Sequence, residues 1–490
     1  GPFPTAHPLG ATTPMRKRTL LLATALTTGL LALPATSASA APSGLPGDFN
    51  GDGYRDIALT AGTATVSGKY MAGRAAVVYG SSTGLNTAKR TVLSQASTGI
   101  PGTPETEDTF GDSLATGDLD GDGYTDLVVG APNEKTGTDT HAGAVTIVWG
   151  SASGLSGGTT VTDPRPTKHD YFGVTLAVGD FDGDGHDDLA VGSTGSTVDI
   201  IRGGFTKSGT YGGTSTVTTA LDPNATSGSL AAGDTDMDGV DDLVVQGYAP
   251  YGEGADDQYA ATYLFLHPVT SPSAITLPGA YAAAVGDLNK DGYGDIVLGN
   301  PLDKTSDPGG ALGGKVTVIP GSATGPALTA TKSYTQATAG VPGTAEEMDR
   351  FGTSLSVGDA DADGYGDLAI GSPGEAIGSA GDAGTVVLLR GSATGLTMTG
   401  AKAYSQSTSG VPGASEKNDS FGSGVLLADI NKNGRADLTT GAAFENGGTG
   451  AVWNLRGSST GLTTSGATSF SPSALGFDGA QAMFGNHISG

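Results

Sequence analysis

The chain contains 490 residues, including 83 glycines and no cysteine, and its formal net charge is −26. It can therefore form no disulfide and no thiolate metal site, and its negative charge disfavours binding to nucleic acid or anionic lipid. The many glycines and the low charged content of 15% favour short strands and tight turns, while 37% hydrophobic residues argue against a disordered chain.

Residues 15–40 have the pattern of a signal peptide. Met15-Arg16-Lys17-Arg18 provides a basic start, residues 20–33 are apolar, and Ala38-Ser39-Ala40 provides small residues for cleavage after Ala40. The apolar stretch is shorter than the roughly 20 residues that a membrane span needs. We therefore predict a secreted protein without membrane insertion, in which residues 1–14 are an upstream extension or an expression remnant.

An Asp-rich nonapeptide of the form D-x-[DN]-x-[DN]-G-x-x-D organises the rest of the chain. Its seven copies begin at Asp48, Asp118, Asp180, Asp234, Asp287, Asp359 and Asp429. Most copies follow an F-G-x-x-L-x-x-G segment and precede two apolar runs, a G-S-x-x-G turn and a more variable segment. Four strands in each of seven units predict an all-β fold, a seven-bladed β-propeller of four-stranded antiparallel blades.

The two ends of the chain complement each other. No Phe-Gly segment precedes the first nonapeptide, but Phe484-Gly485 near the C-terminus provides one. We therefore predict that the C-terminal strand pairs beside the strand after Asp56, in blade one. This pairing closes the ring and removes the two open edges that a linear stack of blades would leave.

The predicted propeller spans residues 44–490. Its blades are predicted at about 44–100 with 478–490, and then at 101–164, 165–222, 223–275, 276–340, 341–410 and 411–477. Blades four and five have Ser227-Gly228 and Ala280-Tyr281 in place of Phe-Gly. This departure predicts that their inner strands are less regular.

The repeated series resembles a known family. Phe110-Gly111, Asp118 to Asp126 and Gly130-Ala131-Pro132 together are similar to the FG-GAP repeat of integrin α-subunit propellers and their bacterial secreted relatives. The resemblance implies a propeller whose partners bind on the face opposite its calcium loops. It implies no particular partner, because one fold hosts many functions.

The nonapeptides have the chemistry of calcium loops. Ca²⁺ takes about 6–8 oxygen ligands, which positions 1, 3, 5 and 9 supply from side chains and position 7 from its carbonyl. Glycine at position 6 permits the sharp turn, and the gathered carboxylates would repel one another without a cation. The predicted ligands are Asp48, Asn50, Asp52, Tyr54 and Asp56; Asp118, Asp120, Asp122, Tyr124 and Asp126; Asp180, Asp182, Asp184, His186 and Asp188; Asp234, Asp236, Asp238, Val240 and Asp242; Asp287, Asn289, Asp291, Tyr293 and Asp295; Asp359, Asp361, Asp363, Tyr365 and Asp367; and Asp429, Asn431, Asn433, Arg435 and Asp437.

Other metal sites fit the nonapeptides less well. An EF-hand needs Glu at position 12, where these copies have Leu59, Val129, Val191, Val245, Leu298, Ile370 and Thr440. Zinc favours His or Cys, neither of which recurs, and Mg²⁺ demands a tighter geometry. Turns with solvated carboxylates are the structural alternative. We predict up to seven structural Ca²⁺ ions, the seventh bound most weakly because Asn431 and Asn433 reduce the charge of its loop.

Strand alternation places the nonapeptides and the G-S-x-x-G turns on one face and the longer loops on the other. Three of these longer loops are near copies that start at Gln95, Gln336 and Gln406. Each carries two acids before its Phe: Glu105 and Asp108, Glu346 and Asp349, and Glu416 and Asp419. Their repetition favours acids that order the loop by accepting backbone amides. Residues 248–259 are the most distinctive candidate for ligand contact, with an ordinary surface loop as the alternative.

The sequence predicts no catalytic residue and no organic cofactor. Gly80–Gly84 and Gly457–Gly461 match the G-x-S-x-G nucleophile elbow, but they are expected at hairpin turns, whereas an elbow joins a strand to a helix. We therefore predict a monomeric, secreted, non-enzymatic scaffold for binding or adhesion. Its unknown protein or glycan partner is expected on the face opposite the calcium loops. A lectin-like propeller and a propeller hydrolase or lyase are the alternatives.

Overall fold

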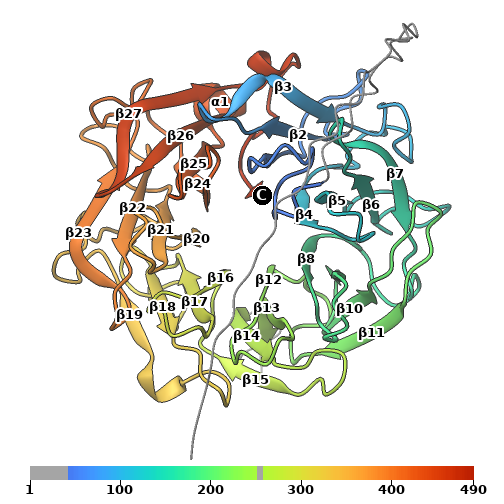
Figure 1. The fold of residues 1–490 in the computed structure, drawn as a ribbon, viewed down its shortest axis with the longest axis horizontal. Coiled ribbons are helices and arrows are strands. Elements are labelled where there is room, and N and C mark those ends of the chain that lie inside the picture. The colour runs from blue at the N-terminus through green and yellow to red at the C-terminus, as the bar shows by residue number, and fades with distance from the viewer. Residues whose placement is uncertain (1–41, 251–257) are drawn as a thin grey trace, which may run out of the picture. The chain divides into compact units, whose positions relative to one another are not determined.

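The computed structural model describes residues 42–250 and 258–490, so the predicted signal peptide and the residues before it lie outside the described part. These residues form seven four-stranded antiparallel sheets around a central axis (Figure 1). The seven-bladed propeller predicted from the repeat is therefore confirmed.

Each blade runs from the centre of the ring to its rim. The innermost strands are β28 (Ile488–Ser489), β4 (Ser113–Gly117), β8 (Thr175–Gly179), β12 (Ser229–Gly233), β16 (Ala282–Gly286), β20 (Ser354–Gly358) and β24 (Phe421–Ala428). The second strands are β1 (Ile57–Ala61), β5 (Asp126–Ala131), β9 (Asp188–Gly192), β13 (Asp242–Pro250), β17 (Asp295–Asn300), β21 (Asp367–Ser372) and β25 (Asp437–Ala442).

The third and outer strands complete the blades. The third strands are β2 (Arg74–Tyr79), β6 (Ala144–Trp149), β10 (Thr197–Arg202), β14 (Gln258–Phe265), β18 (Lys315–Ile319), β22 (Thr385–Arg390) and β26 (Ala451–Ser458). The outer strands are β3 (Asn86–Leu93), β7 (Ser156–Val161), β11 (Gly213–Thr218), β15 (Ala274–Leu277), β19 (Lys332–Tyr334), β23 (Thr397–Tyr404) and β27 (Gly461–Phe470).

Helical structure in the described residues is confined to short segments. These are the helix α1 (Glu445–Gly448) and the 3₁₀ turns η1 (Leu328–Ala330) and η2 (Pro472–Leu475). In this part of the chain, no helix has both the length and the apolar character needed to cross a membrane.

The hydrophobic core lies between neighbouring blades. Strand β5 is buried along its whole length, whereas β3 at the rim is mostly exposed or half-buried. Leu127 and Val129 on β5 pack with Ala75 and Val77 on β2 of the preceding blade. The middle strands therefore read as continuous apolar runs because both of their faces are covered, while the polar outer strands face solvent.

The C-terminal segment closes the ring, as predicted. Strand β28 pairs antiparallel with β1, and Figure 1 shows the red end of the chain beside the blue first blade. The Gly485 N–H donates to the Thr60 carbonyl at 3.0 Å, as the Gly111 N–H donates to the Gly130 carbonyl at 2.9 Å in blade two. Phe484 is fully buried, with its ring centre 6.1 Å from that of Phe470.

The prediction of less regular inner strands in blades four and five is wrong. Strands β12 and β16 each pair with their second strand over five residues without a register shift. By contrast, β24 has a register shift although it begins with Phe421-Gly422. The Gly228 and Tyr281 N–H groups both donate to carbonyls of the second strand at 2.8 Å. These backbone bonds hold the inner strands in place without a Phe-Gly turn.

Replacing Phe484 with Ala should destabilise the whole propeller, because this ring fills the core at the closure. A buried Phe→Ala change costs about 3–5 kcal/mol. Phe444→Ala is the matched control, since the Phe444 side chain is 46% exposed. The free energy of unfolding, measured by chemical denaturation, should fall only for Phe484→Ala. Equal stability of the two variants would contradict closure by this segment.

Candidate metal centres

The last aspartate of each nonapeptide is buried at or just before the start of the second strand of its blade. Asp126, for example, is fully buried, and its Oδ2 accepts the Leu119 N–H at 3.0 Å. Its Oδ1 accepts the Gly150 N–H at 2.8 Å. Gly150 begins the turn between the third and outer strands, so this carboxylate ties the nonapeptide to that turn. The contact confirms that the two lie on one face.

The first aspartate of each nonapeptide shapes the loop itself. Asp118 accepts the Asp122 N–H at 3.0 Å and the Gly123 N–H at 2.9 Å. Gly123 has φ of +86°, and the glycine at position 6 has positive φ in all seven copies. Because this backbone conformation is unfavourable for side chains with a Cβ atom, glycine is needed there.

Several nonapeptides bring their predicted ligands together. Ligand atoms of Asp118, Asp120 and Asp122 lie within 4.8 Å of one another, and so do those of two further trios. The further trios are Asp180, Asp182 and Asp188, and Asp234, Asp236 and Asp242.

These loops fit a hard cation. Asp120 Oδ1, Asp236 Oδ1 and Asp242 Oδ1 are buried without a hydrogen-bond partner. Since an ionised carboxylate only accepts hydrogen bonds, such an oxygen is stabilised by a proton or a cation. Oxygen donors gathered in a flexible loop are the ligand type that Ca²⁺ prefers.

Burial makes the last aspartates costly to ionise. Burial, together with a smaller contribution from neighbouring aspartates of the same loop, raises the pKa of Asp56 and of Asp126 to about 8, against the ordinary 3.8. The same cause raises the pKa of Asp188 and Asp242 to about 7, and that of Asp295 to about 6. Backbone N–H donors oppose the shift in each case. A bound cation would oppose it as well.

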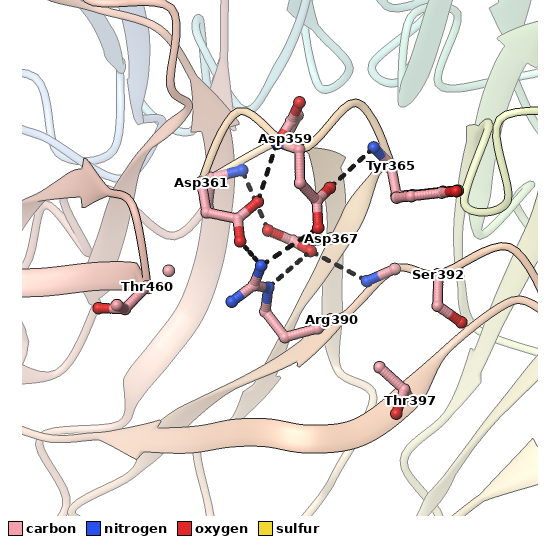
Figure 2. Close-up of polar contacts among 12 residues, drawn as sticks. Asp359, Asp361, Tyr365, Asp367, Arg390, Ser392, Thr397 and Thr460 are labelled. Atoms are coloured by element: carbon pink, nitrogen blue, oxygen red, sulfur yellow. Dashed lines mark hydrogen bonds and ion pairs between the residues drawn. The ribbon is translucent and has the colours of Figure 1, made fainter.

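The sixth nonapeptide is contacted by an arginine from outside the loop, which the sequence analysis missed. Arg390, at the end of β22, points into the loop, and Figure 2 shows it between Asp361 and Asp367. Its Nε lies 3.2 Å from Asp367 Oδ1 and its Nη2 lies 3.4 Å from Asp363 Oδ2. The side chain also pairs with Asp361. The predicted ligands at positions 3, 5 and 9 therefore face an internal positive charge.

In the seventh nonapeptide, a neutral amide rather than a guanidinium contacts the buried carboxylate. The Asn431 amide donates to both oxygens of Asp437, at 3.1 and 2.8 Å. In the first and fifth loops, Asn50 and Asn289 instead donate to the aspartate at position 5. The Asn431 side chain thus covers the buried carboxylate that is a predicted ligand in this loop.

Backbone bonds link neighbouring nonapeptides around the ring. In five of the seven loops, the residue at position 8 donates its N–H to the position-1 carbonyl of the preceding loop. This bond joins Thr125 to Asp48, Asp241 to Asp180, Gly294 to Asp234, Gly366 to Asp287 and Ala436 to Asp359, at 2.7 to 3.1 Å. The loops therefore form a connected belt on one face of the propeller.

On the opposite face, the three near-copy loops are ordered by their acids, as predicted. Asp108, Asp349 and Asp419 accept the backbone N–H of the glutamate three residues before them, at 2.5 to 2.6 Å. The glutamate side chains do not form these bonds.

The first glutamine of each of these loops has a role that the sequence analysis missed. Gln95 Nε2 donates to Glu134 Oε2 at 2.5 Å, Gln406 donates to Glu445 at 2.7 Å, and Gln336 pairs with Glu375. The equal separation of 39 residues in all three pairs is a signal that could have revealed them.

Most of the candidate ligand patch at residues 248–259 lies outside the described residues. Tyr248 is described, and its ring packs edge to face against Tyr281 with centroids 5.7 Å apart.

Comparison with known proteins supports this architecture. The sequence matches the family described as FG-GAP repeat over residues 40–78, 110–148, 172–217, 279–319, 351–389 and 421–455. The chain is an FG-GAP repeat protein. Its propeller resembles those of integrin α subunits.

Three curated relatives illustrate the similarity. Integrin alpha pat-2 of Caenorhabditis elegans is 32% identical over 271 residues, which are 54% of this chain and 18% of that protein. Integrin alpha-IIb of Mus musculus is 31% identical, over 29% of this chain and 15% of that protein. Phosphatidylinositol-glycan-specific phospholipase D of Mus musculus is 35% identical, over 30% of this chain and 17% of that protein. The matched region thus spans less than one fifth of each of these relatives.

Without divalent ions, the protein should become more stable as the pH falls from 8.5 to 6. The folded state holds Asp56 and Asp126 at pKa values near 8, so it binds protons in this range that the unfolded chain does not. The melting temperature in a chelator should therefore rise toward pH 6. Asp126→Asn should weaken this dependence, whereas Glu347→Gln, an exposed charge-matched control, should leave it unchanged. A melting temperature independent of pH would contradict the prediction.

Proposed function

We propose that this protein is a secreted, calcium-binding, non-enzymatic scaffold that presents a binding or adhesion face. The belt of seven acidic nonapeptides on one face of a closed ring carries this proposal. The similarity to integrin α subunits supports a role in binding, and the signal-like residues 15–40 support secretion. Each nonapeptide could hold one Ca²⁺ through the side chains at positions 1, 3, 5 and 9.

Calcium has a structural role in this proposal. The ion would neutralise carboxylates that burial and mutual repulsion make costly to ionise, and would thereby fix the turn between the first and second strands. The ordered backbone bonds of each loop hold the carboxylates close together before any ion binds. Extracellular calcium modules commonly bind with Kd of about 10⁻⁴–10⁻³ M, which suits standing occupancy outside cells.

The partner face is proposed to be the one opposite the nonapeptides. A cavity of about 390 Å³ opens there among the loops around blade three. Its polar lining includes Asp139, Lys168, His169, Asp170, Thr194 and Asn224. Polar side chains in a cavity of this size could orient a polyhydroxylated ligand, which favours a glycan-binding propeller as the second candidate.

A hydrolytic propeller is a weaker alternative. The two G-x-S-x-G segments join β2 to β3 and β26 to β27, so neither lies between a strand and a helix. Binding to a glycan array would favour the lectin-like function over a protein partner. Turnover of a glycosylphosphatidylinositol, a phosphodiester or a polysaccharide would contradict the non-enzymatic proposal.

Chelation should lower the melting temperature. An ion that binds only the folded state adds RT ln(1 + [Ca²⁺]/Kd) per site, about 1.4 kcal/mol at tenfold excess over Kd. Calorimetric melts in EDTA and in 10 mM CaCl₂ measure this difference. Mg²⁺ at the same concentration is the control and should stabilise less. Identical melts in EDTA and CaCl₂ would count against structural calcium.

Replacing Arg390 with Ala should increase the dependence of stability on calcium. The guanidinium offsets the charge of Asp361, Asp363 and Asp367, so its loss should lower the melting temperature in EDTA and restore it only when calcium binds. Arg202→Ala is the matched control, because Arg202 is 38% exposed and 3.9 Å from Asp182. If both variants respond to calcium as the unmodified chain does, Arg390 does not neutralise its loop.

A further inference from the structure

The fourth blade lacks the G-S-x-x-G turn, and a histidine stands at the position of the first glycine of that turn. Leu243 pairs with Phe265, as Leu127 pairs with Val148 in blade two. By this register, His267 occupies the position of Gly150. The substitution brings an imidazole to the edge of the nonapeptide formed by residues 234–242.

The same change leaves a buried carboxylate oxygen without its usual donor. In the other six blades, Oδ1 of the last aspartate accepts the N–H of the turn glycine. In blade four, Asp242 is fully buried and its Oδ1 has no hydrogen-bond partner. Its Oδ2 accepts the Thr235 N–H at 2.8 Å and also pairs with the Thr235 hydroxyl. A buried, acceptor-only oxygen in this position indicates a site for a cation.

The imidazole and the carboxylates lie within the reach of one ion. His267 Nδ1 is 3.4 Å from Asp238 Oδ2, and ligand atoms of Asp236, Asp238 and His267 lie within 4.8 Å of one another. Asp236 also belongs to the cluster with Asp234 and Asp242, and its Oδ1 is likewise buried and unpartnered. Asp236 therefore joins the imidazole to the acidic loop.

The surroundings of this cluster leave it open to an ion. Among the residues that the structure describes, no lysine or arginine forms a salt bridge with these four aspartates. In the sixth loop, by contrast, Arg390 forms ion pairs with Asp361 and Asp367. His267 and Asp238 are 39% and 34% exposed, so an ion can enter from solution.

We propose that the fourth nonapeptide and His267 form a mixed imidazole–carboxylate site for a first-row transition ion such as Zn²⁺. Ca²⁺ takes oxygen ligands, whereas Zn²⁺ binds imidazole nitrogen as well as carboxylate. A site with one imidazole and several carboxylates therefore binds Zn²⁺ in the presence of Ca²⁺. This inference rests on the proposed function, in which the nonapeptides bind cations, and gives one of them a different ion.

The experiment uses the whole chain, stripped of metal and then equilibrated with 10 mM Ca²⁺ and a small excess of Zn²⁺. After gel filtration in the calcium buffer, bound zinc and calcium are counted by mass spectrometry. We expect one retained Zn²⁺ per chain. His267→Ala should weaken zinc binding by roughly tenfold or more, since loss of outer-shell partners alone costs about 10–100-fold in metal affinity.

His141→Ala is the matched control, because His141 is an exposed histidine outside the nonapeptides. This variant should retain the zinc. Co²⁺ in place of Zn²⁺ provides a spectroscopic measurement, and its visible absorption should change only in His267→Ala.

The outcomes separate the two proposals. Calcium bound without zinc in the unmodified chain, or zinc binding unchanged in His267→Ala, overturns this inference and leaves the calcium proposal standing. Failure to bind either metal overturns the calcium proposal itself. An unchanged calcium-dependent melt of His267→Ala shows that the variant folds.

Discussion

The buried carboxylate at the end of each nonapeptide is the interaction on which the blades depend. One of its oxygens accepts an N–H from the start of the loop, and in six blades the other accepts an N–H from the turn between the third and outer strands. Because these donors would otherwise be buried without partners, an aspartate at this position joins two separate loops at a fixed distance. The position is Asp in all seven copies, whereas Asn replaces Asp at position 3 in three copies and at position 5 in one.

The backbone structure of the loop is therefore the same in each blade, whereas the charge of the loop differs between blades. The backbone bonds to the first and last aspartates recur around the ring, and they need no ion to form. The side chains that contact the carboxylates at positions 3, 5 and 9 differ from blade to blade. Arg390 enters the sixth loop, Asn431 covers Asp437 in the seventh, and Lys207 lies 3.3 Å from Asp120 in the second. One repeated fold thus provides loops that differ in charge and in the side chains that contact their carboxylates.

Sequence reasoning succeeded where the signal is local and repeated. The nonapeptide fixes its turn through contacts within nine residues, so each copy can be recognised in the sequence. The number of copies therefore predicts the number of blades. The closure at Phe484 was predictable because the first repeat lacks one strand and the last residues provide it. Arg390 was not predictable in the same way, since its contact with Asp367 arises from the pairing of β21 with β22 across 23 residues. The prediction for blades four and five was wrong because it assumed that the Phe side chain of the Phe-Gly segment keeps the inner strand regular. The backbone bonds of Gly228 and Tyr281 hold these inner strands in place without it.

The belt of nonapeptides gives the propeller a means of coupling its blades. Five of the seven loops bond through their backbone to the loop before them, and side chains add further contacts between loops. Lys290 of the fifth loop lies 5.7 Å from the ring centre of Tyr365 in the sixth, and Lys432 of the seventh lies 6.0 Å from that of Tyr54 in the first. The second of these contacts crosses the closure of the ring, where the terminal strand β28 supplies only two paired residues. Order in one loop is therefore passed to the edge of a neighbour that is bonded to it, and the Lys432–Tyr54 contact reinforces the ring at the point where its sheet is shortest.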